Sequence, residues 1–223
     1  MKILVFVSKW VGFKCLSVLL TNFPDDEYEF VVMEPDSKLI INKLNKYNYQ
    51  YKILNDNTIN WIRSLEDEYF DWLLNLWGNH IFREDILVKV KNSVNIHPSL
   101  LPFGRGSDPI VWSIRYGFPA GITLHKITLD VDEGPIFYQE EIKYRIPTTG
   151  GELYEKVIDR CWKVFSEQWV NLRSGNSKVI EQYSKSSSKT FRRKDLIQDN
   201  IINLDQDIES RHFVNKFLAH DFG

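Results

Sequence analysis

Residues 3–7 read Ile-Leu-Val-Phe-Val, an unbroken apolar run that is rich in β-branched side chains. Such a run, without polar alternation, is typical of a strand that is buried on both faces of a parallel sheet. A parallel strand is normally followed by a crossover helix, because its neighbour must start again at the same end of the sheet. The run therefore predicts the first strand of an α/β fold.

Beyond this strand, candidate helices and strands alternate along the chain. In the first third, strands are expected at 28–33, 51–54 and 71–76, and helices at 13–22, 37–47 and 58–69. Further along, strands are expected at 94–97, 121–127 and 136–141, and helices at 109–116 and from 153 to about 175. The alternation predicts an open, Rossmann-like and mostly parallel α/β sheet with helices on both faces.

The composition changes after residue 175. Ser184–Ser188 is low in complexity, Lys189–Lys194 is basic and Asp195–Glu209 is acidic. We expect a main domain over residues 1–175, followed at 176–223 by a linker and a small C-terminal appendage.

The overall composition excludes several classes of protein. The chain has 223 residues, of which 43% are hydrophobic and 26% charged, as in ordinary globular proteins. Its net charge of −2 provides no broad positive field for a nucleic acid. Two cysteines cannot form a disulfide framework, and the apolar run near the N-terminus is too short for a signal peptide or a membrane span. We therefore expect a cytoplasmic protein with neither nucleic acid nor membrane as partner.

The stretch that carries chemistry reads Asn95-Ile-His97-Pro-Ser-Leu-Leu-Pro102. Side chains two residues apart on a strand share a face, so Asn95 and His97 project together at a strand end. Asp132 lies in a turn between two later strands and reaches the same place if both loops lie at one end of the sheet. An imidazole that accepts a proton, an amide that stabilises an oxyanion and a carboxylate that orients the imidazole suit acyl transfer.

These residues also have less specific interpretations. Asn95 and His97 can be a turn-capping asparagine and a structural histidine, and Asp132 can be an ordinary turn residue. A metal site formed by two histidines and one carboxylate, from His97, His125 and Asp132, is another alternative. No HExxH motif or paired-cysteine spacing supports a metal.

Several linked motifs together resemble a known family. They are the Asn95–Pro102 run, Arg105-Gly106, Trp112, Gly121-Ile-Thr-Leu-His125 and Asp132-Glu-Gly-Pro-Ile136. The pattern resembles the formyltransferases that use 10-formyltetrahydrofolate and extends over about residues 70–175. That family includes enzymes that act on glycinamide ribonucleotide, on methionyl-tRNA and on nucleotide-linked amino sugars.

The resemblance implies a set of site residues. Its catalytic asparagine, histidine and aspartate correspond to Asn95, His97 and Asp132. The pterin of the cosubstrate 10-formyltetrahydrofolate would be held, largely through backbone groups, by two loops, and no metal is implied. The expected cofactor-binding residues are Leu76, Trp77, Gly78, Asn79, His80, Ile81, Phe82, Asp130 and Val131.

The resemblance also restricts the amine that accepts the formyl group. Only residues 176–223 follow the main domain, little for a tRNA-binding domain, and the first strand leads into Ser8-Lys9-Trp10 rather than the phosphate loop of the glycinamide ribonucleotide enzymes. The Arg105-Gly106 loop and the tail Thr190–Leu196 instead resemble the nucleotide-sugar enzymes, with a dTDP-linked amino sugar as the first choice. The expected substrate-binding residues are Lys9, Trp10, Lys14, Ser99, Arg105, Gly106 and His125.

Two alternatives stay open at this point. The chain can be a relative that formylates another small amine, as the glycinamide ribonucleotide enzymes do, or a folate- or nucleotide-binding protein without activity. The resemblance further suggests a homodimer.

Overall fold

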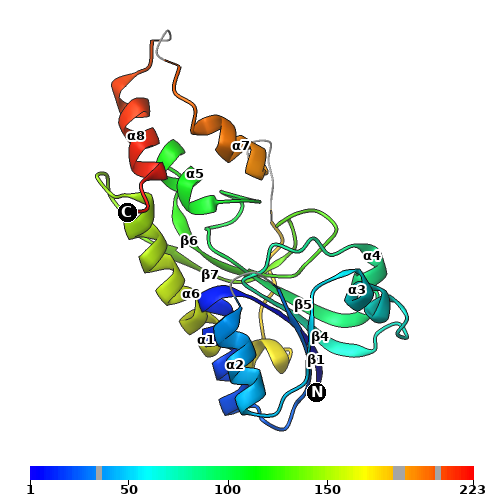
Figure 1. Cartoon of the computed structure of the whole chain (residues 1–223). Helices are drawn as coiled ribbons and strands as arrows, with labels where there is room; N and C mark the ends of the chain where they lie inside the picture. Colours follow the sequence, from blue (N-terminus) through cyan, green and yellow to red (C-terminus); the bar gives the residue numbers. More distant parts are fainter. Residues whose placement is uncertain (34–36, 183–188, 204–206) are drawn as a thin grey trace.

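The computed structural model describes residues 1–33, 37–182, 189–203 and 207–223, and its strands form a seven-stranded sheet (Figure 1). The order across the sheet is β3-β2-β1-β4-β5-β6-β7. The strands are β1 (Lys2–Val7), β2 (Glu27–Val32), β3 (Tyr51–Ile53), β4 (Phe70–Leu76), β5 (Val90–His97), β6 (Ala120–His125) and β7 (Ile136–Ile142). The first five are parallel, whereas β6 runs antiparallel to both of its neighbours. The predicted α/β class with a mostly parallel sheet is confirmed.

Helices cover both faces of this sheet, as Figure 1 shows. On one face lie α1 (Lys9–Asn22), α2 (Lys38–Lys46) and α6 (Gly150–Arg173), and on the other α3 (Asp56–Arg63) and α4 (Glu84–Leu87). The apolar run of β1 explains why both faces are needed. Ile3, Val5 and Val7 belong to one hydrophobic cluster, whereas Leu4 and Phe6 belong to a second.

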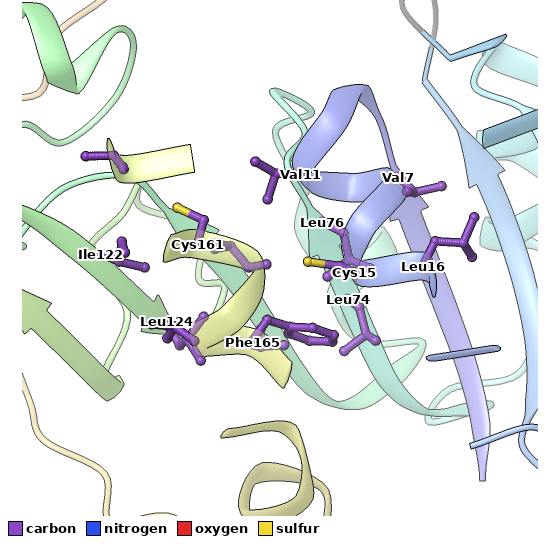
Figure 2. Packing of buried hydrophobic residues seen from close by; sticks show 14 of the residues in the cluster. Val7, Val11, Cys15, Leu16, Leu74, Leu76, Ile122, Leu124, Cys161 and Phe165 are labelled. Atoms are coloured by element: carbon purple, nitrogen blue, oxygen red, sulfur yellow. The ribbon is translucent and has the colours of Figure 1, made fainter. Parts of the chain in front are cut away.

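Both cysteines lie in the larger of the two hydrophobic clusters. Cys15 on α1 and Cys161 on α6 are free thiols with 0% exposure, surrounded by apolar side chains of the sheet and helices (Figure 2). Burial raises the pKa of both thiols, because the charged thiolate is poorly solvated in an apolar interior. The two side chains therefore act as small apolar core residues.

The C-terminal part of the chain packs against the main body. It contains α7 (Arg193–Asp199) and α8 (Ser210–His220), and α8 lies beside α5 (Pro109–Tyr116) in Figure 1. The ring of Phe191 stacks on that of Trp112, with centroids 4.3 Å apart, and both are buried. The tail thus shares the hydrophobic core of the main domain. The expected low-complexity stretch Ser184–Ser188 lies outside the described residues, and the division at residue 175 stays a prediction.

The observed ends of three elements differ from the expected ones. Helix α1 begins at Lys9 rather than at 13, and its first turn combines the exposed Lys9 and Trp10 with the buried Val11 and Gly12. Strand β5 begins at Val90 rather than at 94, and its first residues escape the sequence prediction because the exposed Lys91 and Asn92 interrupt the apolar pattern. Helix α3 ends at Arg63, well before the expected residue 69, and α4, α7 and α8 were not expected.

The structure contains no helix among its described residues that is both long enough and apolar enough to span a bilayer.

Candidate active site

Three polar residues occupy one level of the sheet where β4, β5 and β6 lie side by side. Asn95 pairs in register with Asn75 on β4 and with His125 on β6. Asn75 Nδ2 donates to Asn95 Oδ1 at 2.8 Å, and Asn95 Nδ2 lies 3.0 Å from His125 Nε2. Backbone pairing places the three side chains next to one another, and the hydrogen bond from Asn75 turns the NH2 group of Asn95 away from β4.

Asp132 reaches this row from the loop that follows β6. The ends of the loop meet where Lys126 N–H donates to the Pro135 carbonyl at 2.8 Å, and Asp132 sits within it at a φ of +56°. The Asp132 carboxylate accepts from Asn95 Nδ2 at 3.4 Å and from the Gly106 N–H at 2.8 Å. Aspartate tolerates the left-handed conformation better than most residues, which suits a tight loop of this kind.

His97 lies on the other side of the same carboxylate. Its Nδ1 is 3.4 Å from Asp132 Oδ2, and its Nε2 is 2.9 Å from the Gly104 carbonyl oxygen. Because a carbonyl only accepts, Nε2 carries the hydrogen in the neutral ring and Nδ1 has the free lone pair. Burial lowers the pKa of His97, and the opposing attraction of Asp132 does not fully offset it. The ring is thus neutral and able to accept a proton at neutral pH.

The carboxylate of Asp132 is held in its charged form. Burial alone would favour the protonated acid, but His97, His125 and the Gly106 N–H hold the pKa of Asp132 well below its usual range. His125 Nε2 lies 3.3 Å from Asp132 Oδ1, while its Nδ1 faces the Lys126 carbonyl at 2.8 Å. One anionic side chain therefore contacts the amide and both imidazoles.

These groups line a cavity of about 940 Å³. This volume lies near the upper end for sites that hold small molecules and cofactors. Asn95, His97 and Asp132, which were expected to meet, all lie in its wall. The sequence reasoning placed Asp132 at the sheet end through a turn, and the loop after β6 brings it there.

Most of the expected cofactor-binding residues also line the cavity. They are Trp77, Gly78, Asn79, His80, Ile81, Phe82, Asp130 and Val131. Leu76 does not line the cavity, because its side chain is fully buried in the core on β4.

The expected substrate-binding residues fall into two groups. Lys9, Gly106 and His125 line the cavity. The structure does not bring the other four to it: Trp10, Lys14, Ser99 and Arg105.

Each of these four residues has another environment. The Lys14 ammonium lies over the ring of Trp162, 4.5 Å from its centroid, and the ring of Trp10 stacks on Phe13. Ser99 is buried and donates to the Phe103 carbonyl at 2.7 Å.

Arg105 is 2% exposed and contacts neighbours in the protein rather than the cavity. Its Nη1 lies 3.0 Å from Glu133 Oε1, and its Nη2 donates to Gln182 Oε1 at 2.8 Å. The guanidinium thus connects the loop that carries Asp132 with the chain after α6.

Sequence reasoning missed several residues of this site. Asn75 belongs to an apolar strand, and its partner Asn95 lies 20 positions later, so only the strand register reveals the pair. Met33 at the end of β2 and the tail residues Thr190–Arg193 also line the cavity. The basic composition of the tail and its likeness to a family do not indicate which groups it faces.

The loop after β4 has features that fit a flat, polar ligand. Asn75 Oδ1 is buried and accepts no hydrogen bond from the described residues. Gly78 is confined, because a Cβ there would lie 2.3 Å from Met33 Cε and 2.4 Å from Asn75 Oδ1. Backbone groups of residues 77–82, a free buried acceptor and apolar walls from Ile81 and Phe82 are suitable contacts for a pterin ring.

The alternative of a metal site receives no support from the geometry. Within the residues that the structure describes, no three histidine, cysteine or acidic side chains are arranged to hold a metal ion. In the site itself, the carboxylate of Asp132 lies between the two imidazoles and contacts both.

Comparisons with known proteins identify a family that this chain resembles. Residues 72–168, which contain β5, β6 and most of β4, match the family model described as formyl transferase. The curated relatives that the chain matches include methionyl-tRNA formyltransferases, and the chain spans between 22% and 65% of the length of the first four.

Individual matches extend this likeness. The dTDP-4-amino-4,6-dideoxyglucose formyltransferase of Mycobacterium bovis is 28% identical over 69% of this chain and 65% of its own length. A sugar N-formyltransferase from a Shewanella species has a TM-score of 0.83 at 20% identity, covering 100% of this chain and 89% of that one.

A third match covers nearly all of both chains. The formyltransferase of Anoxybacillus kamchatkensis, solved with UDP-4,6-dideoxy-4-formamido-L-AltNAc and tetrahydrofolate, is 25% identical over 98% of each chain, with a TM-score of 0.67.

Proposed function

We propose that this chain, which belongs to the formyl transferase family, moves a formyl group from 10-formyltetrahydrofolate to the primary amine of a nucleotide-linked amino sugar. The observation that carries the proposal is the position of the Asp132 carboxylate, which lies 3.4 Å from both the Asn95 amide and the His97 ring in one cavity wall. Folate as the cosubstrate is supported by the loop at residues 77–82 and by the tetrahydrofolate in the Anoxybacillus structure.

The reaction forms a carbon–nitrogen bond between the acceptor amine and the formyl carbon, and the bond from that carbon to the folate nitrogen breaks. 10-Formyltetrahydrofolate supplies the electrophilic formyl carbon when it is bound. The products are a formamide on the sugar and tetrahydrofolate.

The residues of the chain divide the work of this transfer. The free lone pair on His97 Nδ1 accepts the proton that the attacking amine loses, because burial keeps the pKa of His97 low and the ring neutral. The Asn95 amide N–H donates to the formyl oxygen as negative charge develops there. Asp132, charged and 3.4 Å away, stabilises the imidazolium that results. The imidazolium then returns its proton to the folate nitrogen as the bond between that nitrogen and the formyl carbon breaks.

The proposed amine acceptor rests on the name of one relative and on two cations beside the cavity. We take a dTDP-linked amino sugar as the acceptor, because the mycobacterial relative is named for such a sugar. Lys9 and Arg192 on the cavity rim are the cations that we assign to the diphosphate.

The test is a turnover screen of the purified full chain. Each reaction contains 10-formyltetrahydrofolate and one amine: a dTDP-linked 3- or 4-amino sugar, a UDP-linked amino sugar or glycinamide ribonucleotide. We expect tetrahydrofolate and a formamide of matching mass with a dTDP-linked sugar. Turnover only with glycinamide ribonucleotide would reassign the acceptor, and binding of folate without any turnover would favour an inactive relative.

A variant links the assay to the site. Asn95→Ala removes the proposed oxyanion donor, so kcat should fall by roughly a hundredfold to a thousandfold. An Asn95→Ala protein with unchanged kcat would remove Asn95 from the mechanism.

We further propose that the chain forms a homodimer in the cytoplasm. The apolar side chains of Phe213, Val214 and Phe217 on α8 are 39%, 48% and 54% exposed, as expected for a face that a second copy covers. Sedimentation equilibrium measures the mass directly, and a monomer at micromolar concentration would contradict the dimer.

A further inference from the structure

The chain after α6 contacts the backbone of the Asp132 loop through one side chain. Gln182 Nε2 donates to the Asp132 carbonyl at 3.0 Å and to the Gly134 carbonyl at 2.7 Å. Two residues earlier, Ile180 exchanges a pair of backbone hydrogen bonds with Ile136, at 2.7 and 2.9 Å. The amide of Gln182 is therefore held beside the loop by the backbone that precedes it.

The orientation of that amide is fixed by chemistry. Gln182 Oε1 accepts from Arg105 Nη2 at 2.8 Å, and a guanidinium can only donate. The two carbonyls on the other side can only accept, so a flipped amide would lose all three hydrogen bonds. The buried charge of Arg105, paired with Glu133, thus directs the NH2 group of Gln182 at the loop.

A second part of the tail reaches the carboxylate end of the same aspartate. Phe191 N–H donates to the Arg105 carbonyl at 2.9 Å, and Ser107 N–H donates to the Phe191 carbonyl at 2.8 Å. Between them lies Gly106, whose N–H donates to Asp132 Oδ2. A Cβ on Gly106 would lie 2.1 Å from the Phe191 carbonyl oxygen, so only glycine fits this close approach.

We propose that Gln182 is a positioning residue that holds the Asp132 loop so that its carboxylate faces His97, which makes the C-terminal segment part of the catalytic machinery. Gln182 itself does not line the cavity and acts through Asp132. The catalytic consequence rests on the proposed function, whereas the positioning of Asp132 does not.

The test compares two glutamine variants. Gln182→Met keeps the length of the side chain and removes its hydrogen bonds to the loop. Gln139→Met is the matched control, because the part-buried Gln139 amide also donates twice, to the Leu101 carbonyl at 2.7 Å and to Thr123 Oγ1 at 3.0 Å. Both variants should lower Tm by a similar amount.

Only Gln182→Met should lower kcat, by about tenfold, with the KM of both substrates changed less than about twofold. Gln182→Asn, which keeps the amide on a shorter side chain, should fall between wild type and Gln182→Met. Equal kcat losses in the Gln182→Met and Gln139→Met proteins, or none in either, would overturn a positioning role.

A titration of the histidines by NMR gives a readout that needs no activity. The titratable neighbours that shift the pKa of His97 are Asp132, which raises it, and His125, which lowers it. If the carboxylate moves away in Gln182→Met, the His97 titration should shift to lower pH, while Gln139→Met should leave it in place.

An unchanged His97 titration in Gln182→Met would overturn the proposal even if the enzyme is active. A shifted titration in a chain that releases no tetrahydrofolate would instead preserve the positioning role and contradict the proposed function.

Discussion

Two parts of the chain meet at Asp132, and they reach it in different ways. On the sheet, Asn75, Asn95 and His125 occupy neighbouring register positions on three adjacent strands, and backbone hydrogen bonds set their directions. The C-terminal segment reaches the same aspartate directly through Gln182 and indirectly through Phe191, which pairs with the residues on either side of Gly106. Strand register thus sets the position of Asn95, one of the residues proposed for chemistry, whereas the tail supports the loop that carries Asp132.

If the strands supply the catalytic groups and the tail supports them, the largest loss of activity should follow substitution of a residue on a strand. His97→Ala removes the proposed proton acceptor, and the rate constant measured in a single turnover should fall by about a thousandfold. His212→Ala on α8, where the side chain is 60% exposed, is the matched control and should retain full activity. A rate within threefold of wild type in His97→Ala would contradict the assignment of chemistry to the strand ends.

Asp132, where the two parts meet, should give the next largest effect. Asp132→Asn keeps the shape but removes the charge that stabilises protonated His97, so kcat/KM should fall by about a hundredfold.

The pH dependence of the same variant has a definite sign. Activity needs neutral His97 and is lost as the pH falls through its pKa, which burial already lowers. Without the attraction of Asp132 that pKa falls further, so the acidic limb of the kcat/KM profile should move to lower pH. A limb that stays in place would show that another group titrates.

An Asn75 variant tests whether a residue within the sheet also positions a catalytic group, the Asn95 amide. Asn75→Leu removes the donor that orients the Asn95 amide, and kcat should fall by about tenfold, comparable to Gln182→Met. Steady-state kinetics with the preferred sugar measures the change, and Tm shows whether the fold is intact. A loss confined to KM would mean that Asn75 contacts a substrate instead of orienting Asn95.

The smallest effect is expected at the rim formed by the tail. Arg192→Ala removes an exposed cation beside the cavity, so the KM of the nucleotide sugar should rise about threefold at low salt and less at high salt. Lys194→Ala is the control, because Lys194 is exposed two residues later, on α7, but does not line the cavity. A drop in kcat for Arg192→Ala would contradict the prediction that this tail residue affects only the binding of the nucleotide sugar.

The sequence predicts structure well where the spacing of side chains along a strand decides which face they occupy. Ile3–Val7 predicted a strand buried on both faces, and the spacing of Asn95 and His97 predicted that the two side chains share one end of a strand. Asp132 could be placed near them only by assuming where its turn lies, and the resemblance to a family supplied the rest.

Other features depend on contacts between distant residues and have no local signal. The pairing of Asn75 with Asn95 follows from strand register, and Gln182 stands in a stretch whose composition indicates only a linker. Arg105 is among the substrate-binding residues that the resemblance implies. The structure instead surrounds it with Glu133 and Gln182, an arrangement that no spacing in the sequence predicts.

The burial of Cys15 and Cys161 has a practical consequence for measuring how this fold opens. A thiol reagent can modify these side chains only when α1 and α6 separate from the sheet. Since both are the only cysteines of the chain, the rate of alkylation, followed by mass spectrometry, reports the frequency of that opening without any introduced probe. Ligands that bind the closed form should slow both modifications together.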